Sequence, residues 1–461
     1  MSITRRTLLV GAGTGAVAVL LAACTPEPQP KPTRTSTPAP RPSAPADVPK
    51  PEGWLRSTWA SDPYSFGSVS YLPAGADPGE RQKLAEPILD RLFFAGEATD
   101  STRPGTVLGA VDAGRRSALA LMSSTTENER IAVVGAGVAG VIAGRMLADA
   151  GHEVTIFEAR ERIGGRIHSD ADAQQWPMPP QLGAWLLTEK DLAALGDRLI
   201  DVGEDTLALE TPTGWSKEGE APTVEGRQIA DALQRAESQP SDLPITEALE
   251  ANGVDLDDPA LAASLAWLSA MTGVDPTRAS SWYAPEFPAD SLHGATGDLD
   301  SFLDDYLDDL EVTLASPVVR VAYDDRGVSL RLGTGEALSY DRVVVTAPLG
   351  VLQQQGIEFA PALPFAHRGA ITALASGFIE TAWMRFAEPF WSTDATIWHV
   401  VGGDGLIGTW LNLQPLTGEP VLVGIVGGAD AEQFAGLSER DAQVAARASL
   451  VFFAEPAADE G

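Results

Sequence analysis

The sequence predicts an α/β protein built around a parallel sheet, and two stretches of the chain carry this prediction. In the first, an apolar run at residues 131–134 precedes a helical pattern up to residue 150 and a second apolar run at residues 154–157. In the second, an apolar run at residues 92–95 precedes a helical pattern at residues 107–122. Strands that alternate with helices are typical of βαβ units, whose neighbouring strands run parallel.

The turn between the first apolar run and its helix contains the glycine pattern G-x-G-x-x-G. Gly135 makes the tight turn, Gly137 lets a pyrophosphate approach the backbone, and Gly140 lets the helix pack closely on the strand. The helix N-terminus offers that anion free N–H groups and a positive dipole end. Glu158 follows about 20 residues further on, where a carboxylate accepts from both ribose hydroxyls. These features predict a Rossmann-type dinucleotide-binding unit and disfavour the alternative of an ordinary glycine-rich turn.

The composition predicts a globular protein with an acidic surface. The 461 residues suffice for two or three domains, and 44% of them are hydrophobic. The net charge of −32 argues against nucleic acid or an anionic membrane surface as the main partner. Such a charge mildly attracts cationic substrates, although a solvated acidic surface is the simpler explanation. The five histidines show no ligand spacing, so we expect no metal site.

The N-terminus has the features of an export signal. A twin-arginine start, Arg5-Arg6, precedes an apolar stretch at residues 8–23 that is short and glycine-rich for a membrane span. The stretch ends in L-A-A-C, which resembles the lipobox of bacterial lipoproteins, and Cys24 is the only cysteine. We expect a signal at residues 1–24, export by the twin-arginine route, and a lipid anchor at Cys24 on the extracytoplasmic face of the cell membrane. The alternative is an inert cysteine in an uncleaved signal.

The segment after Cys24 predicts a tether. Residues 25–51 carry a proline every few residues among threonine, serine, alanine and lysine. Such a composition cannot form a core and favours an extended, semi-stiff chain. We expect this spacer to hold the folded body, which begins near Trp54, off the membrane surface.

Four motifs after the tether resemble the closing segment of flavin-dependent amine oxidases. They are W-x-x-D-P at Trp59, G-S-x-S-Y at Gly67, L-F-F-A-G-E-A-T at Leu92 and P-G-T-V-x-G-A at Pro104. The closest likeness is to polyamine oxidases and lysine-specific histone demethylases. Residues 130–166 resemble the opening segment of the same family, so the resemblance covers nearly everything from about Trp54 onward.

The resemblance implies FAD as the cofactor and an amine-oxidase-like architecture of two domains. One is a Rossmann-type FAD-binding domain, which we place at residues 80–190 and 291–350. The other is an α+β substrate domain with a mixed sheet, which we place at residues 52–79, 191–290 and 351–461.

The order of the segments differs from that of the family. The closing segment precedes the opening segment, each motif occurs once, and the end of the chain resembles what normally precedes Trp59. We interpret this order as a circular permutation in which residues 123–129 join the old C-terminal helix to the first strand. Termini that lie close together on a surface make such a change tolerable. The alternative is a gene-model or assembly artefact that joined two fragments.

The resemblance also implies a set of FAD-binding residues that extends the glycine pattern. Val318 resembles the position that meets the adenine through its backbone. The full set is Gly96, Glu97, Thr106, Val107, Gly135, Gly137, Val138, Ala139, Gly140, Glu158, Ala159, Arg160, Gly164, Gly165, Arg166, Leu182, Gly183, Ala184, Trp185 and Val318.

The catalytic positions implied by the resemblance are mostly substituted. The family's lysine, on the strand before F-x-x-P-F-W, corresponds to Thr381. The two aromatic positions beside the flavin correspond to Val69 and Thr106, although the demethylases also carry threonine at the latter. Trp383 shares a strand face with Thr381 and either forms a new aromatic wall or packs in the core. Tyr71 remains as another aromatic candidate.

The leading hypothesis is an exported, lipid-anchored FAD-dependent oxidoreductase that oxidises an amine to an imine and passes electrons to oxygen or another acceptor. The protein's part in such a reaction is to position the amine and tune the flavin. Because the lysine position is threonine, we expect slow reaction with oxygen rather than loss of FAD. The amine, the acceptor and the oligomeric state stay open. Two alternatives remain: a non-catalytic or low-activity FAD- or ligand-binding lipoprotein, and a flavin desaturase or isomerase on the same fold.

Overall fold

A computed structural model describes most of the chain from residue 45, near the end of the predicted tether, onward. The chain divides into two compact units, Met1–Pro42 and Ser43–Gly461, and the second holds every described residue. The predicted signal with Cys24, and the tether up to residue 44, lie outside the described residues. The predicted boundaries of the two discontinuous domains stay predictions. The described residues are 45, 47–125, 128–170, 174–187, 199–203, 206–210, 226–285, 292–403 and 405–454.

A parallel five-stranded sheet forms the centre of the dinucleotide-binding half, which confirms the predicted fold class. β4 (Arg130–Val134) lies between β5 (Glu153–Phe157) and β14 (Arg342–Val345). β10 (Glu311–Thr313) and β3 (Leu92–Phe94) form the two edges, and every pairing is parallel. β3 precedes β4 in the chain, yet it completes the sheet beside β14.

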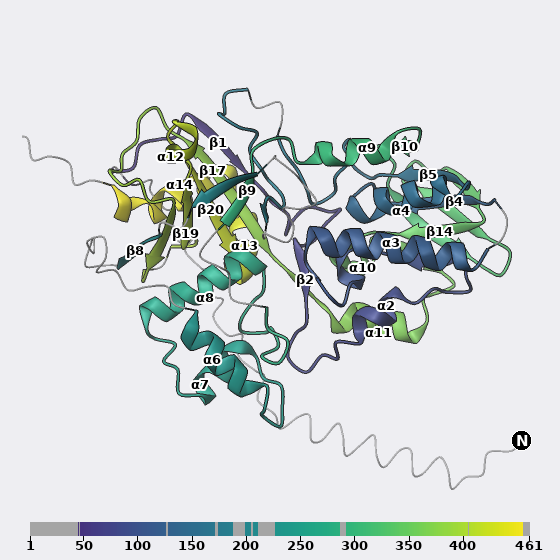
Figure 1. The fold of residues 1–461 in the computed structure, drawn as a ribbon, viewed down its shortest axis with the longest axis horizontal. Coiled ribbons are helices and arrows are strands. Elements are labelled where there is room, and N and C mark those ends of the chain that lie inside the picture. The colour runs from purple at the N-terminus through teal and green to yellow at the C-terminus, as the bar shows by residue number, and fades with distance from the viewer. Residues whose placement is uncertain are drawn as a thin grey trace, which may run out of the picture. The chain divides into compact units, whose positions relative to one another are not determined.

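Two helices cover one face of this sheet and pack against each other (Figure 1). α4 (Val138–Asp149) follows the glycine turn, and α3 (Val107–Ser123) follows β3. Where they meet, a Cβ on Gly114 would lie 2.5 Å from the carbonyl oxygen of Ala139, so only glycine permits this close approach. Their apolar side chains join those of β4 in one core cluster.

The opposite face of the parallel sheet is covered by a smaller sheet, in the order β13-β12-β11-β15, and by three short helices. Because the parallel sheet is buried on both faces, its strands read as continuous apolar runs in the sequence. The covering elements are β11 (Val318–Tyr323), β12 (Val328–Leu332), β13 (Ala337–Tyr340), β15 (Glu358–Ala360), α2 (Glu80–Ala85), α10 (Leu349–Gln353) and α11 (Phe365–Ala373).

A mixed six-stranded sheet, in the order β1-β17-β20-β19-β18-β8, forms the centre of the other half, as the family resemblance implied. The β18–β8 pairing is parallel and the other pairings are antiparallel. One face of this sheet joins the core cluster of the parallel sheet, and the other packs against two helices near the end of the described chain. The strands are β1 (Gly53–Arg56), β8 (Thr206–Glu210), β17 (Ile379–Arg385), β18 (Ile397–Val401), β19 (Thr409–Asn412) and β20 (Val421–Gly427).

Three helices, α6 (Arg227–Ala236), α7 (Ile245–Ala251) and α8 (Pro259–Thr272), surround a separate apolar cluster. α8 also packs on the six-stranded sheet, where a Cβ on Gly427 would lie 1.8 Å from the carbonyl oxygen of Ser269. The remaining elements are β2 (Val69–Tyr71), β16 (Ala375–Gly377), β6 (Leu186–Leu187), β7 (Leu199–Gly203), β9 (Leu292–Ala295), α9 (Asp304–Leu307), α12 (Gln414–Thr417), α13 (Gly428–Ala435), α14 (Glu439–Ser449) and the 3₁₀ turns η1 (Glu97–Thr99), η2 (Asp300–Leu303) and η3 (Val451–Phe453).

Contacts at two places join segments that lie far apart in the chain. Arg447 of α14 donates through Nη2 to the carbonyl oxygen of Pro45 at 2.9 Å, so the first and last described segments touch. Between α3 and β4, Arg342 donates to the hydroxyl of Ser124 at 2.5 Å and to the carboxylate of Glu129 at 3.2 Å. The connection between these two elements is therefore fixed to the sheet at both ends.

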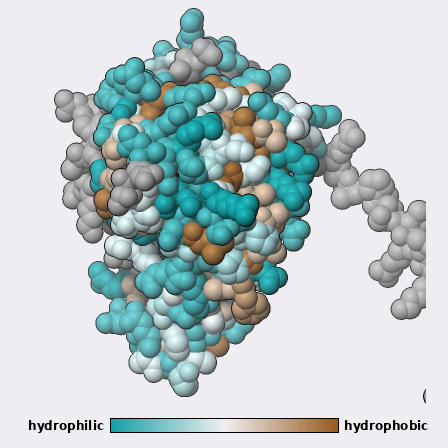
Figure 2. All heavy atoms as spheres, turned by 90° about the vertical axis from the view of Figure 1, so that its right-hand side faces the viewer, coloured by the Kyte–Doolittle hydropathy of each residue, from teal (hydrophilic) through white to brown (hydrophobic). Residues whose placement is uncertain are grey.

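The described surface is mainly polar. Figure 2 shows one face as largely hydrophilic, with small and separate apolar patches. Among the helices of the described chain, none combines the length and the apolar character that a membrane span needs.

Candidate functional site

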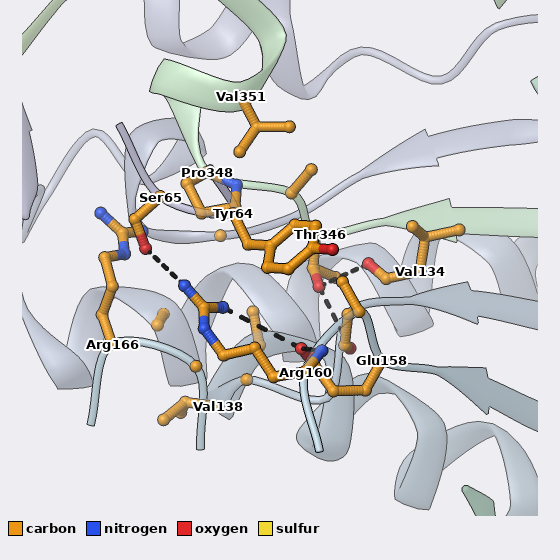
Figure 3. A pocket seen from close by; sticks show the side chains of 18 of the residues that line it. Tyr64, Ser65, Val134, Val138, Glu158, Arg160, Arg166, Thr346, Pro348 and Val351 are labelled. Atoms are coloured by element: carbon orange, nitrogen blue, oxygen red, sulfur yellow. Dashed lines mark hydrogen bonds and ion pairs between the residues drawn. The ribbon is translucent and has the colours of Figure 1, made fainter. Parts of the chain in front are cut away.

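A cavity of about 320 Å³ lies at the carboxyl ends of the parallel strands (Figure 3). Gly135 follows β4, Glu158 follows β5, Thr346 follows β14 and Gly96 comes shortly after β3, and all four residues line the cavity. The loops at this edge of a parallel sheet converge, and ligands of such folds bind there. The cavity thus lies where the strand–helix pattern predicted a dinucleotide.

The glycine turn is shaped by contacts that only glycine permits. Gly135 has a φ of +107°, and a Cβ there would lie 2.5 Å from the hydroxyl oxygen of Thr346. A Cβ on Gly140 would lie 1.9 Å from the carbonyl oxygen of Gly135, so this glycine lets α4 pack on the turn. A Cβ on Gly137 would meet no atom closer than 3.7 Å, because this residue faces the cavity. The first two residues of α4 also line the cavity, which places the positive end of the helix dipole there.

Glu158 is held at the cavity wall by backbone donors. Its side chain is buried, and its two oxygens accept from the N–H groups of Ala136 and Arg160, each at 2.8 Å. A carboxylate offers about four acceptor positions, so Glu158 keeps capacity for the hydroxyl groups of a ribose. This geometry fits the role that the sequence predicts.

Residues 57–68, which we call the strap, form part of the cavity wall. Arg160 donates through Nη2 to the carboxylate of Asp62 at 2.6 Å. It also donates to the hydroxyl of Ser65 at 2.9 Å (Figure 3). The same guanidinium lies 5.5 Å from the ring centroid of Tyr64 and 5.9 Å from that of Trp59. Ion-pair, hydrogen-bond and cation–π contacts therefore bind the strap to the dinucleotide loop.

A second buried carboxylate, Glu97, lies in another part of the wall. It accepts from the hydroxyl of Ser70 at 2.6 Å, the N–H of Gly105 at 2.8 Å and Nη1 of Arg166 at 3.0 Å. Burial alone would raise the pKa of Glu97, but Arg166, Arg81 and Ser70 outweigh it and hold that pKa below its ordinary range. The charged carboxylate thus organises Gly105 and Arg166, both of which line the cavity.

The structure brings most of the predicted cofactor-binding residues together around this cavity. They come from loops that lie far apart in the sequence. The predicted residues that line it are Gly96, Glu97, Thr106, Val107, Gly135, Gly137, Val138, Ala139, Glu158, Ala159, Arg160, Gly164, Gly165, Arg166, Ala184 and Val318.

Four predicted residues lie behind the wall instead: Gly140, Leu182, Gly183 and Trp185. The carbonyl oxygen of Leu182 accepts from the indole N–H of Trp59 at 2.6 Å. A Cβ on Gly183 would lie 2.1 Å from the carbonyl oxygen of Arg166, so this glycine lets two loops pack together. Trp185 is buried in the core. These four residues support the cavity without lining it.

Several lining residues were not among the predicted site residues. Tyr64 and Ser65 directly follow the W-x-x-D-P motif, and Thr346, Pro348 and Val351 follow β14. The W-x-x-D-P motif was a sequence signal that could have identified Tyr64 and Ser65. The last three carry no polar pattern, and only the fold brings them to the cavity.

The histidines of the described chain do not form a metal site. His399 is buried against Trp267, at 5.0 Å between ring centroids, and burial lowers its pKa to about 4. Burial, with Arg162 and Arg160 nearby, also lowers the pKa of His168 to about 4. No group of three or more His, Cys, Asp or Glu side chains in the described ranges could hold a metal ion.

Comparison with known families decides the identity of the cofactor. A family profile described as flavin containing amine oxidoreductase matches residues 39–122 and 221–458. This chain belongs to the flavin-containing amine oxidase family. A profile described as an NAD(P)-binding Rossmann-like domain matches residues 133–194 between the two parts. A cavity built for a dinucleotide, in a flavin-containing family, takes FAD, and the glycine turn and Glu158 fit that molecule.

The relatives of this amine oxidase family member include polyamine oxidases and lysine-specific histone demethylases. Polyamine oxidase 4 of Oryza sativa subsp. japonica is 30% identical over 353 residues, which cover 68% of this chain and 70% of the relative. Lysine-specific histone demethylase 1 homolog 1 of Arabidopsis thaliana is 27% identical over 350 residues, which cover 68% of this chain and 41% of the relative.

Solved structures of amine oxidases share the fold. A wild-type putrescine oxidase bound to putrescine has a TM-score of 0.56 at 18% identity, over 73% of this chain and 84% of that chain. Cyclohexylamine oxidase from Brevibacterium oxydans IH-35A has a TM-score of 0.55 at 18% identity, over 72% of this chain and 82% of that chain.

Thr381, which the sequence resemblance predicts to be the family's lysine position, lies on β17 close to the cavity without lining it. Two residues earlier, Ile379 donates its N–H to the hydroxyl of Ser68, which does line the cavity. Thr381 is buried, and its hydroxyl has no hydrogen-bond partner among the described residues. Its backbone is paired with Ser57, whose hydroxyl accepts from the N–H of Thr381 at 2.8 Å.

The two positions that are aromatic in amine oxidases differ in their placement. Thr106 lines the cavity, but its hydroxyl caps α3 by accepting from the N–H of Gly109 at 2.9 Å. Val69 does not line the cavity and lies behind Gly105, where a Cβ would be 3.4 Å from that of Val69. Neither position supplies an aromatic ring to the cavity.

The other aromatic candidates also point away from it. Trp383 is fully buried, with ring centroids 5.5 Å from Trp185 and 6.1 Å from Trp176, and it donates to the carbonyl oxygen of Gln181 at 2.9 Å. This position agrees with core packing rather than with a wall of the cavity. Tyr71 packs into the cluster of α6, α7 and α8, where burial raises its pKa to about 12.

Proposed function

We propose that this protein oxidises an amine to an imine with FAD and passes the electrons to oxygen or another acceptor. The observation that carries the proposal is the cavity at the carboxyl ends of the parallel strands, in a chain of the amine oxidase family. The amine loses two electrons and two protons, and the acceptor gains them. The names of the relatives, which include polyamine and putrescine oxidases, support an amine as the substrate class.

The residues of the cavity have separate tasks in this proposal. Gly135, Gly137 and the N-terminus of α4 would hold the pyrophosphate, and Glu158 would accept from the ribose of the adenosine. The strap is held at the cavity wall through Arg160, and we expect it to limit the access of water to the bound FAD. When bound, the flavin supplies the two-electron acceptor of the first half-reaction.

The lysine position sets the expected rate with oxygen. Thr381 is short and neutral, so it offers no ammonium to stabilise the negative charge that develops when oxygen accepts an electron. The cations that line the cavity in the described chain are Arg160 and Arg166. We therefore infer slow oxidation by oxygen, which favours a different acceptor in the cell.

The test is the spectrum and the products of the purified protein. We expect flavin absorption bands in the full-length protein, and an aldehyde or ketone with ammonia or a smaller amine after incubation with polyamines and an artificial acceptor. A protein with flavin bands and no product from any amine would favour the second candidate, a ligand-binding flavoprotein without turnover. The substitutions at Thr381 and Val69 motivate that candidate. A desaturase or isomerase remains the third.

We also infer that the chain order is a circular permutation of the family. β3 and α3 precede β4 in the chain, yet they complete its sheet and its helical layer. In the family order, the last segment of this chain would lead directly into the segment that begins near Pro45. The contact of Arg447 with Pro45 supports the idea that the permutation opened the chain between these two segments. The contacts of Arg342 with Ser124 and Glu129 support a stable join of the old termini.

Export and anchoring are proposals from the sequence of residues 1–24. The twin-arginine route carries folded proteins, so FAD can be loaded before export. Replacing Cys24 by alanine should move the protein from the membrane fraction to the soluble fraction without loss of its flavin. Unchanged membrane attachment would contradict the lipid anchor.

A further inference from the structure

A buried chain of polar contacts leads from α2 to the cavity wall. It starts at Arg81, whose side chain is almost inaccessible although no motif includes it. Arg81 donates through Nη1 to the hydroxyl of Ser70 at 2.7 Å and to the carbonyl oxygen of Ala98 at 3.1 Å. The hydroxyl of Ser70 has one proton and gives it to Glu97, so the direction of each bond is determined. The chain ends where Glu97 accepts from Arg166.

The charges of the residues in this series of polar contacts do not cancel. Glu97 and Arg166 alone would form a neutral pair. Arg81 adds a second cation near Glu97, and the other carboxylate near Arg81, Asp100, also compensates Arg116. Burial lowers the pKa of Arg81, but the nearby charges of Glu97 and Asp100 act in the opposite direction. Charges in a poorly hydrated interior act over longer distances than charges in water. The wall at Arg166 is therefore more positive than the visible ion pair suggests.

The other cation that lines the cavity, Arg160, shares its nearby carboxylates with Arg162. Arg160 faces the carboxylate of Asp62 at 2.6 Å and that of Glu158 at 4.0 Å. The Arg166 side of the cavity thus has a further buried cation, Arg81, behind the Glu97–Arg166 pair that lines it, and position 381 is a neutral threonine. A fixed positive charge near a bound flavin stabilises the electrons that it gains, and so raises its reduction potential.

We propose that Arg81 is a positioning residue that holds the Glu97–Arg166 pair at the cavity and raises the reduction potential of the bound FAD. The inference rests on the FAD-dependent function proposed above, but it does not depend on which amine is oxidised. Arg81 acts through Ser70 and Glu97, and it does not line the cavity itself.

The test is the midpoint potential of the FAD in the full-length holoprotein, measured by reduction with dithionite beside a reference dye. Arg81→Gln should shift the potential to a more negative value, and Arg81→Lys should keep most of the wild-type value. Lys83→Gln is the matched control, because Lys83 lies on the same helix with a half-exposed side chain paired to Glu80. It removes the same charge without touching the chain of contacts and should leave the potential unchanged.

Glu97→Gln should shift the midpoint potential in the opposite direction. It removes a negative charge beside Arg166, so the potential should become more positive, and the Arg81→Gln/Glu97→Gln double variant should return towards the wild type. A purely structural role of Arg81 would produce no such opposition. A wild-type potential in Arg81→Gln, or shifts of the same sign in both single variants, would overturn the proposal.

A smaller substitution, Ser70→Ala, tests the proposal even if the Arg81 variants misfold. Ser70→Ala removes only the hydroxyl that links Arg81 to Glu97 and should release FAD severalfold faster. If Ser70→Ala matched the wild type in both FAD affinity and potential, the linked chain would have no role. These measurements need no amine, so they stand even if no amine proves to be a substrate.

Discussion

At the scale of single residues, the proposed slow reaction with oxygen depends on Thr381. Its hydroxyl is buried without a partner in the described chain, beside the core that contains Trp383. Thr381→Lys should raise the rate at which the reduced flavin reacts with oxygen by about tenfold or more, because an ammonium lowers the barrier to electron transfer. Thr381→Val is the matched control and should leave that rate unchanged. Stopped-flow mixing of reduced protein with oxygen measures both rates.

The same variants test the unpaired hydroxyl. Because an unsatisfied buried hydroxyl costs about 1–3 kcal/mol, Thr381→Val should be as stable as the wild type or more stable. Equal oxygen rates in all three proteins would show that the lysine position no longer controls this step.

A second residue-scale prediction concerns pH. Burial raises the pKa of Glu380 to about 7, against the opposing hydrogen bonds from Ser57 and the backbone of the strap. A raised carboxyl pKa contributes stability that is present below about 4.5 and is lost as the pH rises through about 7. The melting temperature should therefore fall between pH 5 and pH 8, and Glu380→Gln should flatten the fall. Burial raises the pKa of Asp300 to about 7 as well, so Asp300→Asn should remove a further part.

Residue roles were predictable where one residue type satisfies a local constraint. Gly135, Gly140 and Glu158 follow from the pattern itself; the structure places Gly135 and Glu158 in the wall and Gly140 behind it. Glu97 was predicted to bind the cofactor, yet its oxygens are occupied by protein donors. Arg81 was not predicted, because its contacts depend on segments that only the fold brings together.

At the scale of elements, two glycines at the start of α4 have different roles. Gly140 allows α4 to pack on the turn, and Gly137 leaves space for the cofactor. Gly140→Ala should prevent α4 from docking, because its Cβ would lie 1.9 Å from the carbonyl oxygen of Gly135. Gly137→Ala should fold, because its Cβ would meet no atom closer than 3.7 Å, but it should weaken FAD binding severalfold. Thermal unfolding and FAD titration of the two variants measure the two effects. Equal losses of stability in both would contradict this division.

The βαβ elements were predictable because their hydrophobic periods are local. β3, α3, β4, α4 and β5 all appear within a residue or two of the predicted bounds. The strap was not predicted to line the cavity, because its contacts with Arg160 are long-range. Trp383 stayed ambiguous for a related reason: a strand's alternation defines its faces but not what packs on them.

At the scale of the whole molecule, the order of the chain is open to direct test. A gene that begins at residue 128, joins residue 454 to residue 47 with a flexible linker of about ten residues, and ends at residue 125 restores the family order. Because loop closure costs little for such a length, this protein should fold and bind FAD as the original does. A chain opened inside β17 is the control and should be insoluble. If only the reordered chain bound FAD, the original order would be an artefact.

The proposed function requires that an amine reduces the FAD held in this cavity. Anaerobic mixing of the full-length holoprotein with putrescine, spermidine, spermine and simple monoamines tests it most directly. We predict that at least one of these amines removes the absorption of oxidised flavin, at a rate that saturates with its concentration. A flavin that stayed oxidised with every amine, while dithionite reduced it fully, would contradict the claim.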